Sequence, residues 1–170
     1  MAMKSRTTAL TAVEQSAFVN KHIPHRIAVI EQGFVNKPNP SYADMTAAAV
    51  FSRTIASFLG IGVRRGQLKL DSDYFEHAKG QSWEVKITDI AGGTFVDLRS
   101  LSVSDQTILL EGLTEVNLAF THLTFWSSRL HQTPGALPTA QYNKNQQEKL
   151  RAMGALVVRL YRRQSTLFRV

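Results

Sequence analysis

The sequence of 170 residues contains no cysteine, which excludes disulfide bonds, thiolate catalysis and cysteine-ligated zinc or iron–sulfur centres. It also has no apolar run near the roughly 18 residues that a membrane-spanning helix needs, so we expect no membrane insertion. The N-terminal residues MAMKSRTTALTAVEQ lack the apolar segment of a secretory signal peptide. The lack of such a segment predicts a cytoplasmic protein.

Proline is scarce as well, and four of the five prolines lie in two loop-like stretches, 36–41 and 132–141. Between such breaks, apolar residues recur with helical periodicity. A hydrophobic fraction of 44% and a charged fraction of 19% are typical of one ordinary globular domain. We therefore predict that residues 1–170 form a single all-α domain, a helical bundle of four or five helices with a small irregular or β-hairpin insertion around 72–103.

Local signals place the ends of these helices. Thr11 and Glu14 have capping-box spacing, and Gly60 is a plausible C-cap after a helix over 42–59. Pro24 predicts a kink or a fresh helix start. In the insertion, the alternating residues WEVKI at 83–87 and TFVDL at 94–98 favour a hairpin, whereas 60–73 is interpreted as an irregular connection carrying a basic pair.

The stretch 104–131, with Ser104 as predicted N-cap, carries an apolar stripe and further apolar residues nearly opposite it. A helix that is apolar on two sides is usually packed on both, so we predict that it runs through the middle of the bundle. The apolar stripes also leave a homodimer open as an interpretation. The stripe consists of Leu109, Leu113, Val116, Phe120, Leu123 and Trp126.

Neither a metal nor a cofactor is predicted. His22 and His25 are three residues apart, but no further histidine or carboxylate follows them with ligand spacing. The glycines of 60–73 fit neither the dinucleotide-binding pattern nor the P-loop pattern.

The net charge of +7 is concentrated near the C-terminus. Residues 141–170 contain seven Lys or Arg and one Glu, a balance of +6, which leaves +1 for residues 1–140. The predicted last helix, which begins near Thr139, carries these cations opposite an apolar face. RNA or DNA phosphates, an acidic protein partner, a membrane surface and plain solvation all remain compatible with that face. The candidate nucleic-acid-binding residues are Lys144, Arg151, Arg159, Arg162 and Arg163.

A polar row on the 104–131 helix is the candidate for chemistry. Glu111, Glu115, His122 and Arg129 lie close to one helix face. A histidine titrates near neutral pH, so the row is compatible with acid–base catalysis or RNA contact around His122. A solvated charged face with a surface histidine is the alternative interpretation.

The order of elements, and the segment VNLAFTHLTFWSSR at 116–129 with its Asn-x4-His-Leu-Thr pattern, resembles the HEPN-like helical-bundle proteins of prokaryotes. Many of these act in toxin–antitoxin, phage-defence or RNA-processing systems. The resemblance implies a metal-independent ribonuclease site with an arginine shortly before a late-helix histidine. His122 matches the histidine, but Glu115–Asn117, where the signature places the arginine, contain none.

Two function classes follow. The favoured one is a non-catalytic nucleic-acid-binding or protein-interaction module that uses the basic C-terminal helix, because it needs no missing residue. The alternative is a HEPN-like ribonuclease or defence component. In it His122 acts as acid and base, Arg53 or Arg129 stabilises the phosphorane charge, and Asn117 orients the leaving group.

Overall fold

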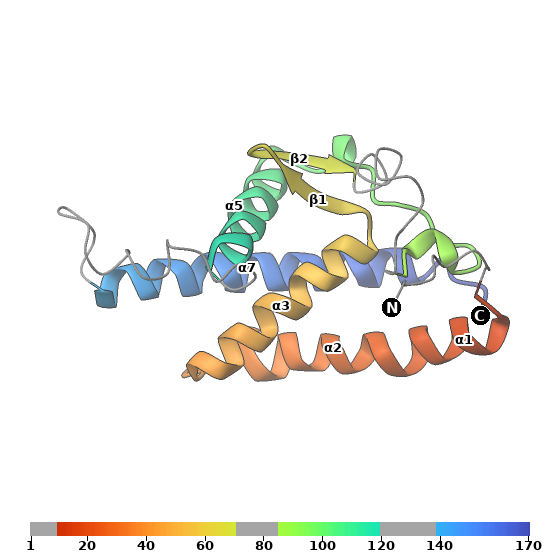
Figure 1. Cartoon of the computed structure of the whole chain (residues 1–170), viewed down its shortest axis with the longest axis horizontal. Coiled ribbons are helices and arrows are strands. Elements are labelled where there is room, and N and C mark those ends of the chain that lie inside the picture. Colours follow the sequence, from red (N-terminus) through yellow and green to blue (C-terminus); the bar gives the residue numbers. More distant parts are fainter. Residues whose placement is uncertain (1–9, 71–84, 120–138) are drawn as a thin grey trace, which may run out of the picture.

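The computed structural model describes residues 10–70, 85–119 and 139–170, and within these ranges the chain is mostly helical (Figure 1). A single two-stranded antiparallel hairpin accompanies the helices of the described ranges. The predicted class, a mainly α-helical bundle with a small β element, is thereby confirmed. The long helical elements are α1 (Ala12–Ala17), α2 (Ile23–Ile30), α3 (Tyr42–Phe58), α5 (Val103–Ala119) and α7 (Thr139–Ser165).

The first helical segment is continuous from α1 to η2 (Glu31–Val35), with the π-turn η1 (Phe18–His22) between α1 and α2. Thr11 caps its start as predicted, since the Glu14 amide donates to the Thr11 hydroxyl and the Glu14 carboxylate accepts from the Thr11 amide at 2.8 Å. Pro24 lies in the first turn of α2, where its missing N–H is tolerated. Pro24 in the first turn of a helix is one of the two predicted alternatives, and the π-helical turn η1 directly precedes that start.

The helix α3 begins with a second capping box, formed by Ser41 and Asp44. It ends as predicted at Gly60, whose φ of 80° is readily adopted only by glycine. A Cβ atom on Gly60 would also lie 2.3 Å from the Phe95 ring, so packing requires glycine here too. Directly after this turn the chain enters the hairpin.

The hairpin joins β1 (Ile61–Arg64) to β2 (Gln67–Leu70), and Arg65 and Gly66 form its turn with φ of 51° and 72°. Two consecutive positive φ values are typical of a type I′ turn. The hairpin alternative predicted for 72–103 is therefore wrong for the described residues, whereas the irregular alternative fits residues 85–102. These form the 3₁₀ turns η3 (Ile87–Asp89) and η4 (Leu98–Ser100) joined by irregular chain.

Burial explains the failure of that prediction. Lys86, assigned to the solvent side of the alternating WEVKI pattern, is only 7% exposed, and its ammonium donates to the Ser57 carbonyl and hydroxyl at 3.1 and 2.7 Å. Val96, within TFVDL, is buried, and its amide donates to the Leu59 carbonyl rather than to a partner strand. Both segments cover the end of α3 instead of pairing with each other.

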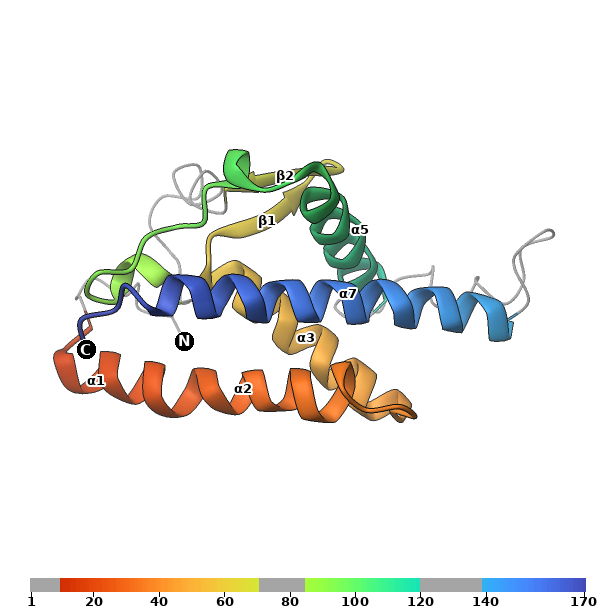
Figure 2. The same ribbon diagram turned by 180° about the vertical axis from the view of Figure 1, so that it is seen from behind.

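The last helix, α7, is the centre of the described fold. Figures 1 and 2 show it spanning the molecule between the α1–α2 segment on one side and α5 with the hairpin on the other. It packs against α3, α5 and η2. Its buried hydrophobic residues are Leu150, Met153, Leu156, Val157, Val158, Leu160 and Tyr161. The predicted central role of 104–131 therefore belongs to α7 in the described part of the chain.

The helix α5 begins at Val103, two residues earlier than an N-cap at Ser104 predicts, and the Ser102 hydroxyl accepts from the Asp105 amide at 3.1 Å. Leu109, Leu113 and Val116 are buried, which confirms the first half of the predicted stripe. The second half, Phe120, Leu123 and Trp126, lies outside the described residues. The expected C-terminal half of this helix stays a prediction.

Two glycines let the helices approach α7 closely. A Cβ on Gly112 of α5 would lie 2.5 Å from the Cβ of Met153, and a Cβ on Gly154 of α7 would lie 3.1 Å from Ile30. Side chains on α5 and α2 can consequently reach those on α7. Among the helices of the described ranges, none is both long and apolar enough to cross a membrane.

Candidate nucleic-acid interface

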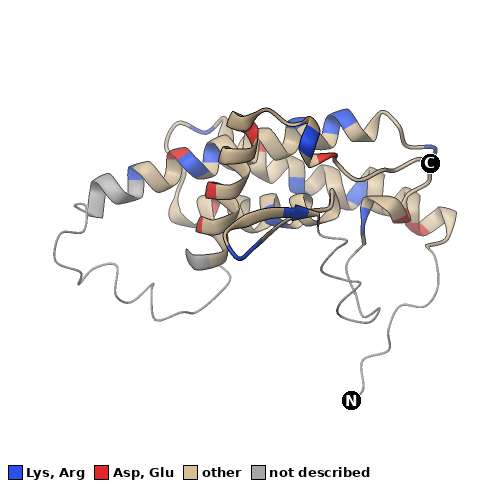
Figure 3. Cartoon of the chain, turned by 90° about the horizontal axis from the view of Figure 1, so that it is seen from above, with Lys and Arg blue, Asp and Glu red and all other residues tan. Residues whose placement is uncertain are grey.

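The predicted nucleic-acid-binding residues do not form one patch. Lys144 and Arg163 are separated by nineteen residues of α7. At a rise of 1.5 Å per residue, about 28 Å of helix axis lies between them. The cations between these ends bond to different neighbours, and Figure 3 shows Lys and Arg positions spread over the molecule rather than gathered in one place.

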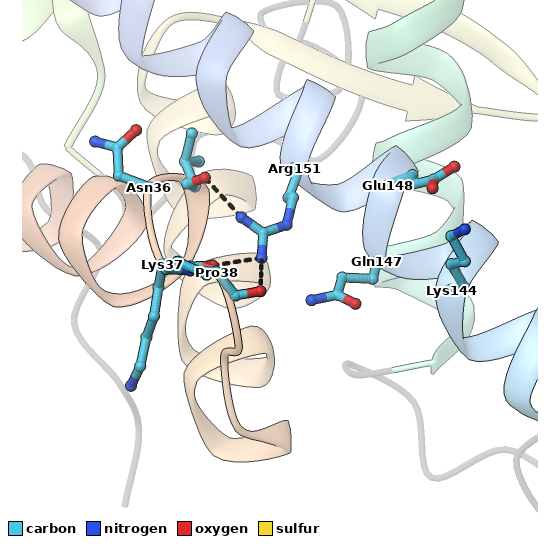
Figure 4. A pocket seen from close by; sticks show the side chains of 8 residues that line it. Asn36, Lys37, Pro38, Lys144, Gln147, Glu148 and Arg151 are labelled. Carbon is cyan, nitrogen blue, oxygen red and sulfur yellow. Dashed lines mark hydrogen bonds between the residues drawn. The ribbon is translucent and has the colours of Figure 1, made fainter.

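Arg151 has a structural role, because its guanidinium bonds to backbone carbonyls of another segment. Its Nη1 donates to the Phe34 carbonyl at 2.7 Å. The Nη1 also donates to the Val35 carbonyl at 2.6 Å, and Nη2 donates to the Lys37 carbonyl at 2.6 Å (Figure 4). The guanidinium also lies 5.0 Å from the centre of the Phe34 ring. These carbonyls end the helix at η2, where a cation interacts favourably with the helix dipole. Arg151 is thus a C-terminal cap supplied by another helix.

A cleft of about 350 Å³ lies beside this cap, between α7 and the loop that follows η2. Its lining mixes both charge signs with amide groups, and Lys37 already bonds the Asp44 carboxylate at 2.7 Å. The hydrogen bond from Lys37, followed by those from Ser41, lowers the pKa of Asp44 to about 2. Lys144 is exposed at the cleft edge. The lining residues are Val35, Asn36, Lys37, Pro38, Lys144, Gln147, Glu148 and Arg151.

Three other cations of α7 face carboxylates on neighbouring helices. Arg159 bonds Asp105 of α5 at 2.8 Å, and Arg162 bonds Glu31 of η2 at 2.7 Å. Lys149 bonds Glu111 of α5 at 3.2 Å. The sequence has seven cations and one acid in 141–170. In the fold, three acids from other helices lie beside this helix and pair with three of these cations.

The end of α7 nonetheless remains open to solvent. The Arg159 and Arg162 side chains are 64% and 63% exposed within their ion pairs. Arg163 is exposed and has no ion pair with any residue in the described ranges. Of the five predicted residues, these three arginines are the ones that the structure brings together.

The residues of the alternative ribonuclease site are not assembled by the described part of the chain. Arg53 is exposed on α3, and Asn117 is half-buried near the end of α5. His122 and Arg129 lie outside the described residues. Glu115, from the same polar row, accepts a hydrogen bond from Gln146 of α7 at 3.5 Å. The catalytic arrangement stays a prediction.

Sequence reasoning missed the cations of the hairpin region. Arg64, Arg65 and Lys69 are exposed on the hairpin, and Arg99 is exposed on η4, which contacts β2. The dipeptide Arg65–Gly66 was the available signal, because a glycine between two short β-prone segments indicates a tight turn. The hairpin cations were seen only as a basic pair within an irregular connection.

The described residues contain no group of three or more His, Cys, Asp or Glu side chains arranged to hold a metal ion. Comparisons with protein-family models, with curated proteins and with solved structures give no match to this chain. The HEPN-like resemblance accordingly stays a prediction.

Proposed function

We propose that this chain is a nucleic-acid-binding module, and that the guanidinium groups at the end of α7 contact phosphates. The observation that carries the proposal is the clustering of Arg159, Arg162 and Arg163 on the solvent side of the last turns of α7, with the first two more than half exposed. This cluster is called the α7 arginine cluster below.

Helix geometry brings the three guanidinium groups within reach of one another. At 100° and 1.5 Å per residue, the positions lie within an arc of about 100° and about 6 Å of helix axis. A duplex or single strand presents phosphates at comparable spacing along its backbone. Arginine suits such contacts because its planar fork can donate two parallel hydrogen bonds to one phosphate.

The two ion pairs of the cluster do not prevent phosphate binding. Exposed ion pairs contribute only about 0.2–1 kcal/mol each, because water screens the charges. A phosphate can therefore take the place of Asp105 or Glu31 at small cost, and Arg163 needs no such exchange.

The surroundings of the cluster indicate contact with the nucleic-acid backbone rather than with bases. The exposed residues along this side of α7 include Ala152 and Ala155, and within 144–165 no exposed residue is aromatic. Unpaired bases are usually held by stacking on aromatic side chains. Binding through this surface should consequently be independent of sequence and strongly dependent on salt.

The experiment measures the affinity for a short RNA and a short DNA duplex by fluorescence anisotropy over a range of salt concentrations. Replacing Arg159, Arg162 and Arg163 together by Ala should flatten the plot of log K against log salt by about 2 to 3 units, from about 0.7–0.9 per lost phosphate contact. The matched control replaces the same three residues by Lys, which keeps the charge and should keep most of the slope.

Two results would overturn the proposal. One is an unchanged slope in the alanine variant. The other is the absence of binding by the unmodified protein at low salt, which would leave an acidic protein as the partner class for this surface.

A further inference from the structure

The hairpin separates its apolar and basic side chains onto two faces. The paired residues Ile61 with Leu70 and Val63 with Leu68 share one face, and both strands contact α5. Alternate residues of a strand point to opposite sides, so Arg64, Gln67 and Lys69 belong to the other face. These three are exposed. Packing on α5 therefore fixes the ribbon and turns its basic face outward.

The turn of the hairpin contains a residue whose backbone conformation is energetically unfavourable. Arg65 has a φ of 51°, a left-handed conformation that Asn, Asp and Gly adopt far more readily in a type I′ turn. The Arg65 side chain is exposed and forms no hydrogen bond or ion pair with the residues described. The geometry of the turn therefore does not favour an arginine at this position. Binding of a negatively charged ligand by the guanidinium would explain why an arginine is found here.

A further cation lies next to the ribbon. Arg99 is exposed on η4, and η4 contacts β2. The nearest acid in this turn is Asp97, whose carboxylate accepts from the Arg99 backbone amide at 3.0 Å. Neither strand of the hairpin contains an acidic residue (Figure 3).

The acids of α5 are turned away from the hairpin. Asp105 bonds Arg159, Glu111 bonds Lys149 and Glu115 accepts from Gln146, all on α7. One helix thus supplies its carboxylates to α7 and its apolar side to the hairpin. This segregation leaves the outer face of the ribbon positive.

We infer that the outer face of the hairpin, with Lys69 on β2, Arg65 at the tip and Arg99 on the neighbouring η4, is a second phosphate-contacting surface for nucleic acid. The inference rests on the proposed nucleic-acid-binding function and adds a contact surface to it. Charge complementarity selects the partner, because a face with cations and no acid on its strands suits a polyanion. A twisted two-stranded ribbon also fits into a nucleic-acid groove.

Charged side chains on exposed strands can also serve only to prevent edge-to-edge association. The two roles differ in what a substitution at the tip does. Arg65→Asn creates Asn-Gly, the preferred dipeptide of a type I′ turn, so the fold is retained while one cation is removed. A protective role predicts aggregation of the variant, and a binding role predicts a soluble variant with weaker binding.

The test uses the full chain with Arg65→Asn and Lys69→Thr combined. The double variant should bind a short RNA or DNA duplex roughly five- to tenfold more weakly per lost contact at moderate salt, with a salt slope flatter by about 1.4 to 1.8. The control, Lys21→Gln with Lys149→Gln, removes the same charge from exposed helix positions and should leave the slope nearly unchanged.

The outcomes separate this inference from the proposed function. If the hairpin variant binds like the unmodified protein while the arginine-cluster variant does not, the inference fails and the proposed function stands. If only the hairpin variant loses binding, the hairpin is the interface and the α7 cluster is not. Equal losses in the hairpin variant and the control would show a net-charge effect and overturn the inference, as would aggregation of the hairpin variant. Absence of binding by the unmodified protein would end both.

Discussion

The last helix and the hairpin carry their cations in opposite ways. On α7, Arg151 caps a helix end, and Lys149, Arg159 and Arg162 face carboxylates of other elements. On the hairpin, Arg65 and Lys69 face outward, and neither strand contains an acid. The more basic segment of the sequence is therefore not the segment whose cations are most available. Charge along a chain predicts a partner only after the fold has paired its own acids and carbonyls.

Two buried or half-buried cations show how the fold uses positive charge internally. Arg151 of α7 binds the carbonyls at the end of η2, and Lys86 binds the Ser57 carbonyl at the end of α3. Both donate to carbonyls in the last turn of a helical segment, where carbonyls lack the full set of helical partners. Such cations act as fixed connections between distant segments, since 116 residues separate Val35 from Arg151.

The largest difference in stability is expected between substitutions of two arginines on the same helix. Arg151→Met should lower the free energy of unfolding by about 2–4 kcal/mol, because it removes the hydrogen bonds that the guanidinium donates to the Val35 and Lys37 carbonyls. The control Arg163→Met should change it by less than about 0.5 kcal/mol, as expected for an exposed position. Urea unfolding followed by circular dichroism measures both values. Equal effects would remove the distinction between structural and available arginines.

The close contact of α5 with α7 gives the next effect. Gly112→Val should lower the free energy of unfolding by about 1–3 kcal/mol, because its side chain would overlap Met153. It should also separate Asp105 and Glu111 from their partners on α7. Gly33→Ala is the matched control, since its Cβ would meet only Val29 at 3.8 Å. Thermal unfolding that ranks the control as the more damaging change would contradict this packing.

A smaller effect of opposite sign is expected at the hairpin tip. Arg65→Asn should raise the free energy of unfolding by up to about 1 kcal/mol, because asparagine tolerates the left-handed conformation better than arginine. The same variant should bind nucleic acid more weakly. Stability and binding measured on one preparation test both statements, and a destabilised variant would show that Arg65 serves the fold.

The smallest change in stability is expected from an acid on α5. Asp105→Asn should lower the free energy of unfolding by only about 0.2–1 kcal/mol, because its ion pair with Arg159 is exposed. Release of Arg159 should tighten nucleic-acid binding by up to roughly fivefold and leave the salt slope nearly unchanged, because Arg159 is already one of the phosphate contacts of the unmodified protein. Anisotropy titrations over a salt series measure both quantities. Weaker binding would mean that Asp105 assists binding rather than competing with phosphate.

Much of the bundle was predictable from local sequence signals. The Thr11 capping box, the turn at Gly60 and the start of α7 near Thr139 depend on neighbouring residues and were predicted correctly. The hairpin was misplaced because alternation in 83–98 imitates a strand pair, while the real turn at Arg65 uses a residue uncommon in that conformation. Local patterns determine helix ends, but strand pairing depends on residues that the pattern does not contain.

The candidate interface was less predictable for a different reason. The roles of Arg151 and Arg159 are set by the loop at 34–38 and by Asp105, which are distant in sequence. No periodicity of the last helix reveals such partners. The outward face of the hairpin likewise depends on α5 covering its apolar side.

The most direct measurement is the reactivity of individual arginines toward a guanidinium-specific reagent, read by mass spectrometry with and without a short RNA. Arg65 and Arg163 should react rapidly in the free protein and be protected by RNA, whereas Arg151 should react slowly in both states. Rapid modification of Arg151, or modification of Arg65 and Arg163 that RNA does not slow, would contradict the division between structural and available cations.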